Sequence, residues 1–386
     1  MAASEIGRTE LGRGAGTAAG QFIGGLPLDI SKIKGRAVAI AGGLVLFVLM
    51  LAISGCGAEQ ERQVQKSELV MDTVAQLTAE GPEAEEAVKE SFARLQELEG
   101  RLSNYREGSD PARLQAAAGT GEWVQVSPEM YHLLEVSQKY SRLTEGAWNI
   151  TAAPLVKLWG IGTDSARVPD REEIEAARSR TGWRKLELDG QGGARLLEAG
   201  MELDLGGIVK GLALDEVRKI YAAHGIKNGL INLGSSSICA LGKNKEGKDW
   251  RIGLRHPRGE TAKDYLAVAS LSDAALSTSG DYERFFEEGG VRYHHILDTR
   301  RGCPAWSWQG LPASARPLSV AVFIDGSDPD CGLKSDLLTT ALFVLGPEQG
   351  QQLLASGGLQ GISAVMVTED MERHCLGEAR KYLGAN

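Results

Sequence analysis

The sequence predicts an α+β protein with antiparallel-rich sheets and packed helices. Segments with strand character come in runs with helices inserted between them, whereas a parallel sheet requires regular alternation of strands and helices. The composition is typical of a folded body, with 42% hydrophobic and 24% charged residues in a chain of 386. We see no internal repeat of about 20 to 50 residues that would indicate a solenoid or a propeller.

Apolar residues spaced by three or four positions predict the helices. The spacing is clear where Val88, Phe92 and Leu95 follow one another, and again after Val209, where Gly225 is placed to form a left-handed C-terminal cap. The expected helices cover 83–102, 128–140, 172–181, 209–220 and 335–345.

Runs of β-branched and aliphatic residues predict the strands. The strongest case is 318–324, and a strand pair is expected on either side of a glycine-rich turn near residue 190. The expected strands cover 69–78, 185–188, 195–203, 229–233, 250–254, 266–271, 291–297 and 318–324.

The N-terminus has the pattern of an export signal. A basic cluster, Lys32 to Arg36, precedes 19 apolar or small residues at 37–55. This segment ends in ISGC at 53–56, which resembles the lipobox of bacterial lipoproteins and implies cleavage before Cys56 and lipidation of that cysteine. An uncleaved membrane anchor is the alternative, because 19 residues nearly span a bilayer. Both readings place the body on the extracytoplasmic face of the membrane.

These features divide the chain into a signal peptide at 1–55, a tether at 56–68, a body at 69–370 and a tail at 371–386. The formal net charge is −9, without a basic block, so we expect no nucleic-acid partner. The cysteines after Cys56 show no C-x-x-C spacing, and the sequence leaves their disulfide state open.

The stretch MELDLGGIVKGLALDEV at 201–217 suggests an anion site. Gly206 and Gly207 allow a ligand to approach the backbone at a helix start, and Lys210 could reach a phosphate one turn later. Asp204 would repel a phosphate, so it is expected to accept from a donor on a base or ring. The alternative is an ordinary helix with an acidic flank and a solvated lysine.

Another candidate lies in SDLLTTALF at 335–343. Asp336 and Thr340 are four residues apart, on one face of the predicted helix. A carboxylate and a hydroxyl are hard oxygen ligands of the kind that suits Mg²⁺. An aspartate at a helix start is more often a simple cap, which is the alternative here.

A histidine pair and two aromatic segments complete the candidates. His294 and His295 are adjacent on an expected strand, so only one of them can face a given site, where it could accept a proton. A structural role in a polar gap is equally compatible. The aromatic residues of 102–106 and 146–151 could stack on a planar ligand or fill the core.

In this order, the segments resemble the ApbE-type family of FAD:protein FMN transferases over about residues 69 to 365. Matching pieces are MDT at 71, LSNYR at 102, GAWNITAAPLVKLWGIG at 146, LDLGGIVKGLALD at 203, INLGSSSICALG at 231, STSGDYERFF at 277, YHHILDTRRGCP at 293 and SDLLTTALFVLG at 335. The resemblance implies an ApbE-like architecture related to the T-fold.

The resemblance also implies site residues. Asp204 would face the flavin or the adenine, and Lys210 the diphosphate, while Mg²⁺ would be held by Asp336, Thr340 and the carbonyl of Gly207. Residues implied to line the FAD site are Met71, Tyr105, Ala147, Trp148, Asn149, Asp204, Lys210 and His295. The chain departs from the family pattern at Asn149, where aspartate is usual, and at 234–237, where N-L-G-G with an acidic or amide residue is commoner.

The implied reaction transfers FMN from the substrate FAD to a threonine hydroxyl of an exported acceptor protein and releases AMP. His295 would accept the hydroxyl proton, while Lys210 and the Mg²⁺ at Asp336 would neutralise the diphosphate. Acceptors implied by the family are redox-pump subunits and exported FMN-binding domains. The alternatives are an FAD pyrophosphatase that gives FMN and AMP, and a non-catalytic flavin-binding lipoprotein.

Overall fold

An eight-stranded sheet forms the framework of the computed structural model, which describes residues 63–384 other than 262, 309, 357 and 358. Its strands lie in the order β1-β2-β6-β7-β10-β15-β16-β17, and every neighbouring pair is antiparallel. The predicted α+β class is therefore confirmed. The strands are β1 (Gln63–Val70), β2 (Thr73–Glu80), β6 (Asn228–Leu233), β7 (Ser237–Leu241), β10 (Ala274–Gly280), β15 (Pro317–Asp325), β16 (Ile362–Thr368) and β17 (Arg373–Leu376).

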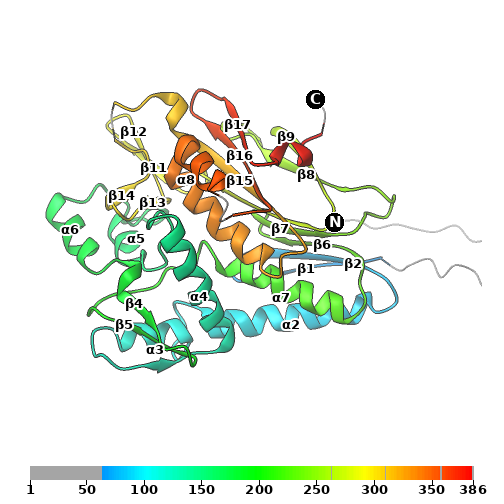
Figure 1. Ribbon diagram of the computed structural model, residues 1–386, viewed down its shortest axis with the longest axis horizontal. Coiled ribbons are helices and arrows are strands. Elements are labelled where there is room, and N and C mark those ends of the chain that lie inside the picture. Colours follow the sequence, from blue (N-terminus) through cyan, green and yellow to red (C-terminus); the bar gives the residue numbers. More distant parts are fainter. Residues whose placement is uncertain (1–62, 262, 309, 357–358, 385–386) are drawn as a thin grey trace, which may run out of the picture. The chain divides into compact units, whose positions relative to one another are not determined.

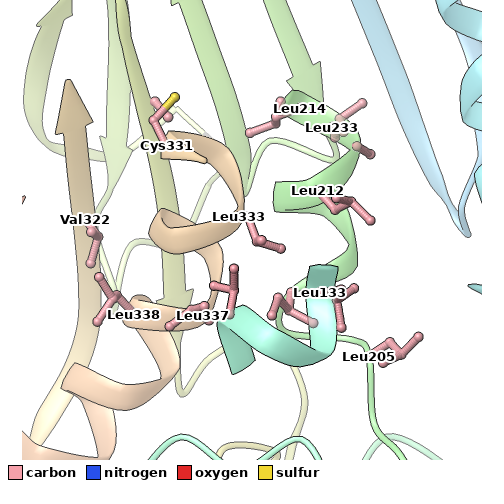
Figure 2. Packing of buried hydrophobic residues seen from close by; sticks show 14 of the residues in the cluster. Leu133, Leu205, Leu212, Leu214, Leu233, Val322, Cys331, Leu333, Leu337 and Leu338 are labelled. Carbon is pink, nitrogen blue, oxygen red and sulfur yellow. The ribbon is translucent and has the colours of Figure 1, made fainter. Parts of the chain in front are cut away.

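One face of this sheet packs against the helices α2 (Ala84–Leu102), α7 (Val209–Ala223) and α8 (Cys331–Ala355) (Figure 1). α8 contacts β10 and β15, and α7 lies between α2 and α8. Figure 2 shows Leu333 of α8 extending toward α7 in the buried core. Burial of these apolar faces is the main force that holds the helices on the sheet.

The opposite face packs against the ribbon of β8 (Trp250–Arg255) and β9 (Tyr265–Leu271) and against a short 3₁₀ helix, η3 (Ala379–Tyr382). The rings of Phe323 and Tyr382 stack with their centroids 4.7 Å apart and join η3 to β15. The sheet is thus buried on both faces, which explains the nearly continuous apolar run of β15 and β16.

The remaining elements flank this framework, and several of them carry loops that reach the site described below. β3, β5 and β4 form a small antiparallel sheet, whereas β11 with β12 and β13 with β14 form separate pairs. These elements are α3 (Asp110–Ala116), β3 (Val124–Gln125), α4 (Pro128–Leu143), α5 (Ala153–Trp159), α6 (Arg171–Ser179), β4 (Leu186–Leu188), β5 (Gly193–Leu196), β11 (Phe285–Glu288), β12 (Val291–His294), β13 (Leu297–Asp298) and β14 (Cys303–Pro304).

The helices α7 and α8 cross with their backbones in contact. A Cβ added to Gly211 would lie 2.4 Å from the carbonyl oxygen of Gly332, and one added to Gly332 would lie 2.5 Å from the carbonyl oxygen of Gly211. Because those distances are far below van der Waals contact, only glycine fits at both positions. The crossing brings the start of α7 against the first half of α8.

Most predicted helices are confirmed, but the boundaries of several elements are wrong. The strand at 69–78 is instead a hairpin that turns at Met71 and Asp72, whose φ values are 55° and 56°. The strand at 195–203 stops at Leu196, because β5 pairs only with the short β3 and β4. The helix at 335–345 begins earlier, at Cys331.

The folded body also extends beyond its predicted limits. β1 begins at Gln63, inside the predicted tether 56–68, and is polar because it is an exposed edge strand. The predicted tail 371–386 contains β17 and η3, and its Leu376, Ala379 and Tyr382 are buried. The predicted signal peptide 1–55 and Cys56 lie outside the described residues. Within the described part of the chain, every helix is too short or too polar to cross a bilayer.

The helix crossing yields a stability prediction. Gly211→Ala should lower the free energy of unfolding by about 1–3 kcal/mol, because the added methyl group overlaps the backbone of α8. Gly350→Ala is the matched control: it is also a buried glycine, and its added Cβ would meet only side-chain atoms at 3.3 Å or more. Urea unfolding measures both, and equal midpoints for the two variants would contradict the close crossing.

Candidate functional site

A cavity of ≈ 1370 Å³ opens beside the start of α7. It is larger than the ~300–1,000 Å³ typical of small-ligand sites and therefore has room for a large ligand. Its walls come from the β1–β2 turn, the loop before α7, the middle of α8 and the β8–β9 ribbon. The cavity brings together every predicted FAD-lining and metal-binding residue, namely Met71, Tyr105, Ala147, Trp148, Asn149, Asp204, Gly207, Lys210, His295, Asp336 and Thr340.

The start of α7 forms one wall of the cavity. The Asp204 carboxylate accepts from the Gly206 N–H at 2.9 Å and closes a tight turn before the helix. A Cβ on Gly207 would lie 3.1 Å from the Trp148 ring and 3.2 Å from Thr340 Oγ1. Any larger residue at 207 would therefore fill the space between the helix start and α8, where a ligand can approach the backbone.

The N-termini of α7 and α8 are capped by each other's aspartates. Asp336 of α8 accepts from the Gly211 N–H at 3.0 Å, while Asp215 of α7 accepts from the N–H groups of Gly332 and Leu333 at 2.9 and 2.8 Å. Neither helix is capped by the side chain of its own N-cap residue. The aspartates thus satisfy amides that a helix leaves unpaired, and they do so across the helix crossing.

Burial raises the pKa of both aspartates. For Asp215 the desolvation outweighs its two backbone hydrogen bonds and the nearby Arg218, and its pKa rises to about 6. For Asp336 the same desolvation raises the pKa, while the positive charge of Lys210 acts in the opposite direction. A further positive charge next to Asp336 would favour its ionised form, since it would offset that desolvation.

Ser236 of the β6–β7 turn and Ser237 at the start of β7 hold the charged groups of the site. Ser237 donates from Oγ to Asp336 Oδ1 at 3.0 Å, and Lys210 donates from Nζ to Ser236 Oγ. The sequence marks 234–237 only as a departure from the family pattern. The bonds of these hydroxyls to Lys210 and Asp336 were missed, because hydroxyl partners so distant in the chain carry no local signal.

Serines of the central strand β10 fasten the same stretch of α8. Ser277 and Ser335 share a hydrogen bond of 2.9 Å, and Ser279 donates to Thr339 Oγ1 at 2.7 Å. Within the part of the chain that the structure describes, the neighbouring Thr340 hydroxyl makes no hydrogen bond. It remains available to a ligand, on a helix face that the sheet holds in place.

The oxygen atoms near Gly207 suit a hard cation. Each Asp336 oxygen accepts one hydrogen bond and retains further lone-pair capacity, and the Thr340 hydroxyl is free among the described residues. Among the described residues, no group of three or more His, Cys, Asp or Glu side chains is arranged so that it could hold a metal ion. One carboxylate, one hydroxyl and one carbonyl therefore fit Mg²⁺, which keeps several waters and substrate oxygens, better than a metal that needs a full protein cage.

The adjacent histidines separate as predicted, although β12 ends at His294 and His295 follows the strand. His294 is buried, holds the Ala305 carbonyl at 2.8 Å and packs edge-on against Phe343. His295 lines the cavity, and its Nδ1 lies 3.3 Å from the Arg284 carbonyl, which can only accept. That contact places the proton on Nδ1 and leaves Nε2 as the basic nitrogen.

Desolvation, together with the positive charge of Arg284, lowers the pKa of His295 to about 3. The exposed surface area of the His295 side chain is that of a half-buried residue. The imidazole nevertheless lies in the cavity wall, where it loses most of its hydration. Desolvation likewise lowers the pKa of His294 to about 4. His295 is therefore neutral at ordinary pH, with Nε2 unprotonated.

The aromatic and amide side chains that line the cavity are of two kinds: some are fixed by hydrogen bonds, and one is exposed and free to contact a ligand. Trp148 is buried and donates to Ser137 Oγ at 2.8 Å, so its ring is a fixed wall behind Gly207. Asn149 donates to Thr299 Oγ1 at 3.1 Å. Tyr105 is 90% exposed at the cavity rim and is free to stack on a planar ligand.

An α+β body with these groups around one large cavity defines a class of protein that can accommodate a ligand of dinucleotide size. Within that class, the chain belongs to the ApbE family, whose sequence model matches residues 71–366. The predicted family membership is thereby confirmed.

Relatives of known name support this assignment. A protein from Treponema pallidum (strain Nichols) named FAD:protein FMN transferase is 35% identical over 345 residues, which cover 84% of this chain and 90% of the relative. A Klebsiella pneumoniae (strain 342) protein of the same name is 34% identical over 282 residues, 73% of this chain and 82% of the relative.

The chain also resembles the crystal structure of the ApbE protein from Thermotoga maritima, with a TM-score of 0.72 at 26% identity, covering 84% of this chain and 100% of that one. For the flavin transferase ApbE from Vibrio cholerae the TM-score is 0.71 at 28% identity, with the same coverage.

The serine contacts yield a second prediction. Ser237→Ala removes a hydrogen bond to the buried Asp336 and should lower the free energy of unfolding by about 1–3 kcal/mol. Ser272→Ala is the control, since it removes an exposed bond to Asp273 and should change stability little. Chemical denaturation of both variants is the measurement, and an unchanged midpoint for Ser237→Ala would show that the hydroxyl does not support the carboxylate.

Proposed function

We propose that this chain transfers FMN from FAD to a threonine hydroxyl of an exported acceptor protein and releases AMP. The observation that carries the proposal is the single cavity in which Gly207, Lys210, Asp336, Thr340 and His295 meet. The names of the relatives support the flavin substrate, and the volume of the cavity suits a dinucleotide.

The proposed reaction is a displacement at the phosphorus of the FMN half of FAD. The threonine oxygen bonds to that phosphorus, the bond from phosphorus to the bridging oxygen breaks, and AMP leaves with that oxygen. The hydroxyl proton passes to Nε2 of His295, which is neutral for the reasons given above. Lys210 holds the diphosphate with its positive charge.

Asp336, Thr340 and the Gly207 carbonyl would hold Mg²⁺. The ion would supply charge neutralisation on the diphosphate oxygens. Ser237 and Gly211 orient the Asp336 carboxylate, and Ser236 orients the Lys210 ammonium, so both groups are held before any ligand enters.

A mass-spectrometric assay tests the proposed function. The purified chain is incubated with FAD, Mg²⁺ and a flavin-acceptor domain, and the products are an FMN adduct on threonine and AMP. AMP release with water in place of the acceptor identifies an FAD pyrophosphatase. FAD binding without either product identifies a non-catalytic flavin-binding protein and contradicts the proposal.

Thr340→Val tests the ion site. The substitution keeps the shape of the side chain and breaks no hydrogen bond among the described residues, so it should not alter stability. It should raise the Mg²⁺ concentration for half-maximal transfer about tenfold, because one ligand is lost. Thr340→Ser restores the hydroxyl and should restore ion affinity, which isothermal titration measures independently of activity. A valine variant with unchanged ion affinity would exclude Thr340 as a ligand.

The pH dependence tests His295. Since its pKa is lowered to about 3 from 6.5, the basic form persists as the pH falls well below 6.5. The transfer rate should therefore show no inflection near pH 6.5 in a profile from about pH 5 to pH 8. His295→Gln should lower the rate about 10²-fold or more across this range. A rate loss centred near pH 6.5 that disappears in His295→Gln would contradict this environment.

We also propose that a lipid on Cys56 anchors the body to the extracytoplasmic membrane face. The supporting observation is the apolar segment 37–55 that ends in ISGC. In an expressing bacterium, Cys56→Ser should abolish palmitate labelling and release the body from the membrane fraction. A Cys56→Ser protein that stays membrane-bound would favour the uncleaved anchor instead.

A further inference from the structure

The strand β8 has an open edge on the cavity. It pairs with β9 on one side only, and the structure places no other described strand against it. The five successive residues from Arg251 to Arg255 all line the cavity. They include residues whose side chains face the main sheet and residues whose side chains face outward. Because side chains from both faces of β8 line the cavity, the cavity runs along the edge of the strand. At such an edge the backbone N–H and C=O groups are unpaired.

The outward face of this edge is basic and aromatic. Arg251, Gly253 and Arg255 alternate along it, and a Cβ on Gly253 would lie 2.4 Å from the Tyr265 ring, so that ring lies across the glycine. Arg251 has no ion pair and no side-chain hydrogen bond to any described residue. The formal net charge of the chain is −9, so carboxylates are abundant, yet this guanidinium is left to solvent.

The same edge leads to the proposed proton acceptor. Arg255 lies 4.9 Å from the centroid of the Tyr282 ring and pairs with Glu283 at 3.6 Å. The next residue, Arg284, accepts the His295 N–H on its carbonyl at 3.1 Å. A chain laid along β8 therefore ends beside His295.

We infer that the open edge of β8 receives an extended, acidic segment of the acceptor protein by β-strand addition, with its threonine at His295. This inference rests on the proposed FMN transfer and adds the chemistry of the partner. The edge supplies main-chain hydrogen bonds, which hold an extended backbone without regard to its sequence. Arg251 selects a carboxylate on that segment, since it lacks one of its own.

A displayed peptide library tests the inference. Peptides with a fixed threonine and randomised flanks are incubated with the full chain, FAD and Mg²⁺, and those that carry FMN are sequenced. Because Arg251 lies at the end of β8 away from His295, Asp and Glu should be enriched about twofold to fivefold several residues from the modified threonine, the effect of one solvent-exposed ion pair. Arg251→Glu should reverse the enrichment toward Lys and Arg. Arg373→Glu, which reverses an exposed arginine on β17 outside the cavity, should leave the preference acidic.

Hydrogen exchange provides the second readout. A synthetic peptide with one threonine flanked by aspartates should slow amide exchange along Trp250–Arg255, and the same peptide with lysines should not. FAD affinity is followed in each variant by flavin fluorescence, so that a damaged flavin site is distinguished from a lost acceptor site.

Different failures separate the two proposals. If the wild-type chain releases AMP from FAD but modifies no peptide, the proposed transfer itself is wrong. If peptides are modified without acidic preference, or with a preference that Arg251→Glu does not change, the transfer stands and the docking inference is overturned. Protection of β8 that depends on protein concentration without peptide would assign the edge to a second copy of this chain and would also overturn it.

Discussion

The site depends on the reciprocal capping of α7 and α8. Each helix begins with amides that its own N-cap side chain does not satisfy, and each receives an aspartate from the other. The exchange requires the helices to touch at Gly211 and Gly332, because the carboxylates are too short to reach across a wider gap. The same contact brings Thr340 to the side of Gly207, so the packing of α7 against α8 determines both the fold and the candidate ion site.

Function and stability therefore share the same atoms. Asp336 caps α7, accepts from Ser237 and is a proposed ion ligand, all with a buried carboxylate whose pKa is raised. Such a group is costly to ionise without a cation, and the nearby Lys210 offsets that cost only in part. In the proposed site, bound Mg²⁺ would offset that cost.

Much of this arrangement was predictable from the sequence, because local patterns carry it. The period of three and four marks α2 and α7, and the glycine pair marks the start of α7 where a ligand can approach. The spacing of Asp336 and Thr340 places them on one helix face. Because His294 and His295 are adjacent, their side chains point in different directions. Each of these inferences depends on backbone geometry over a few residues.

The remaining features depend on distant contacts and were missed or wrong. Met71 and Asp72 adopt positive φ without glycine, so the hairpin between β1 and β2 has no ordinary turn signal. The polar edge strand β1 resembles a tether, and the short η3 becomes core only because β15 supplies Phe323. The most direct test of the central claim is a crystal structure of the chain with FAD and Mg²⁺. It should show the ion about 2.0–2.2 Å from oxygens of Asp336 and Thr340 and from the Gly207 carbonyl, in contact with the diphosphate. An ion or a dinucleotide bound elsewhere, with Asp336 holding only Gly211 and Ser237, would contradict it.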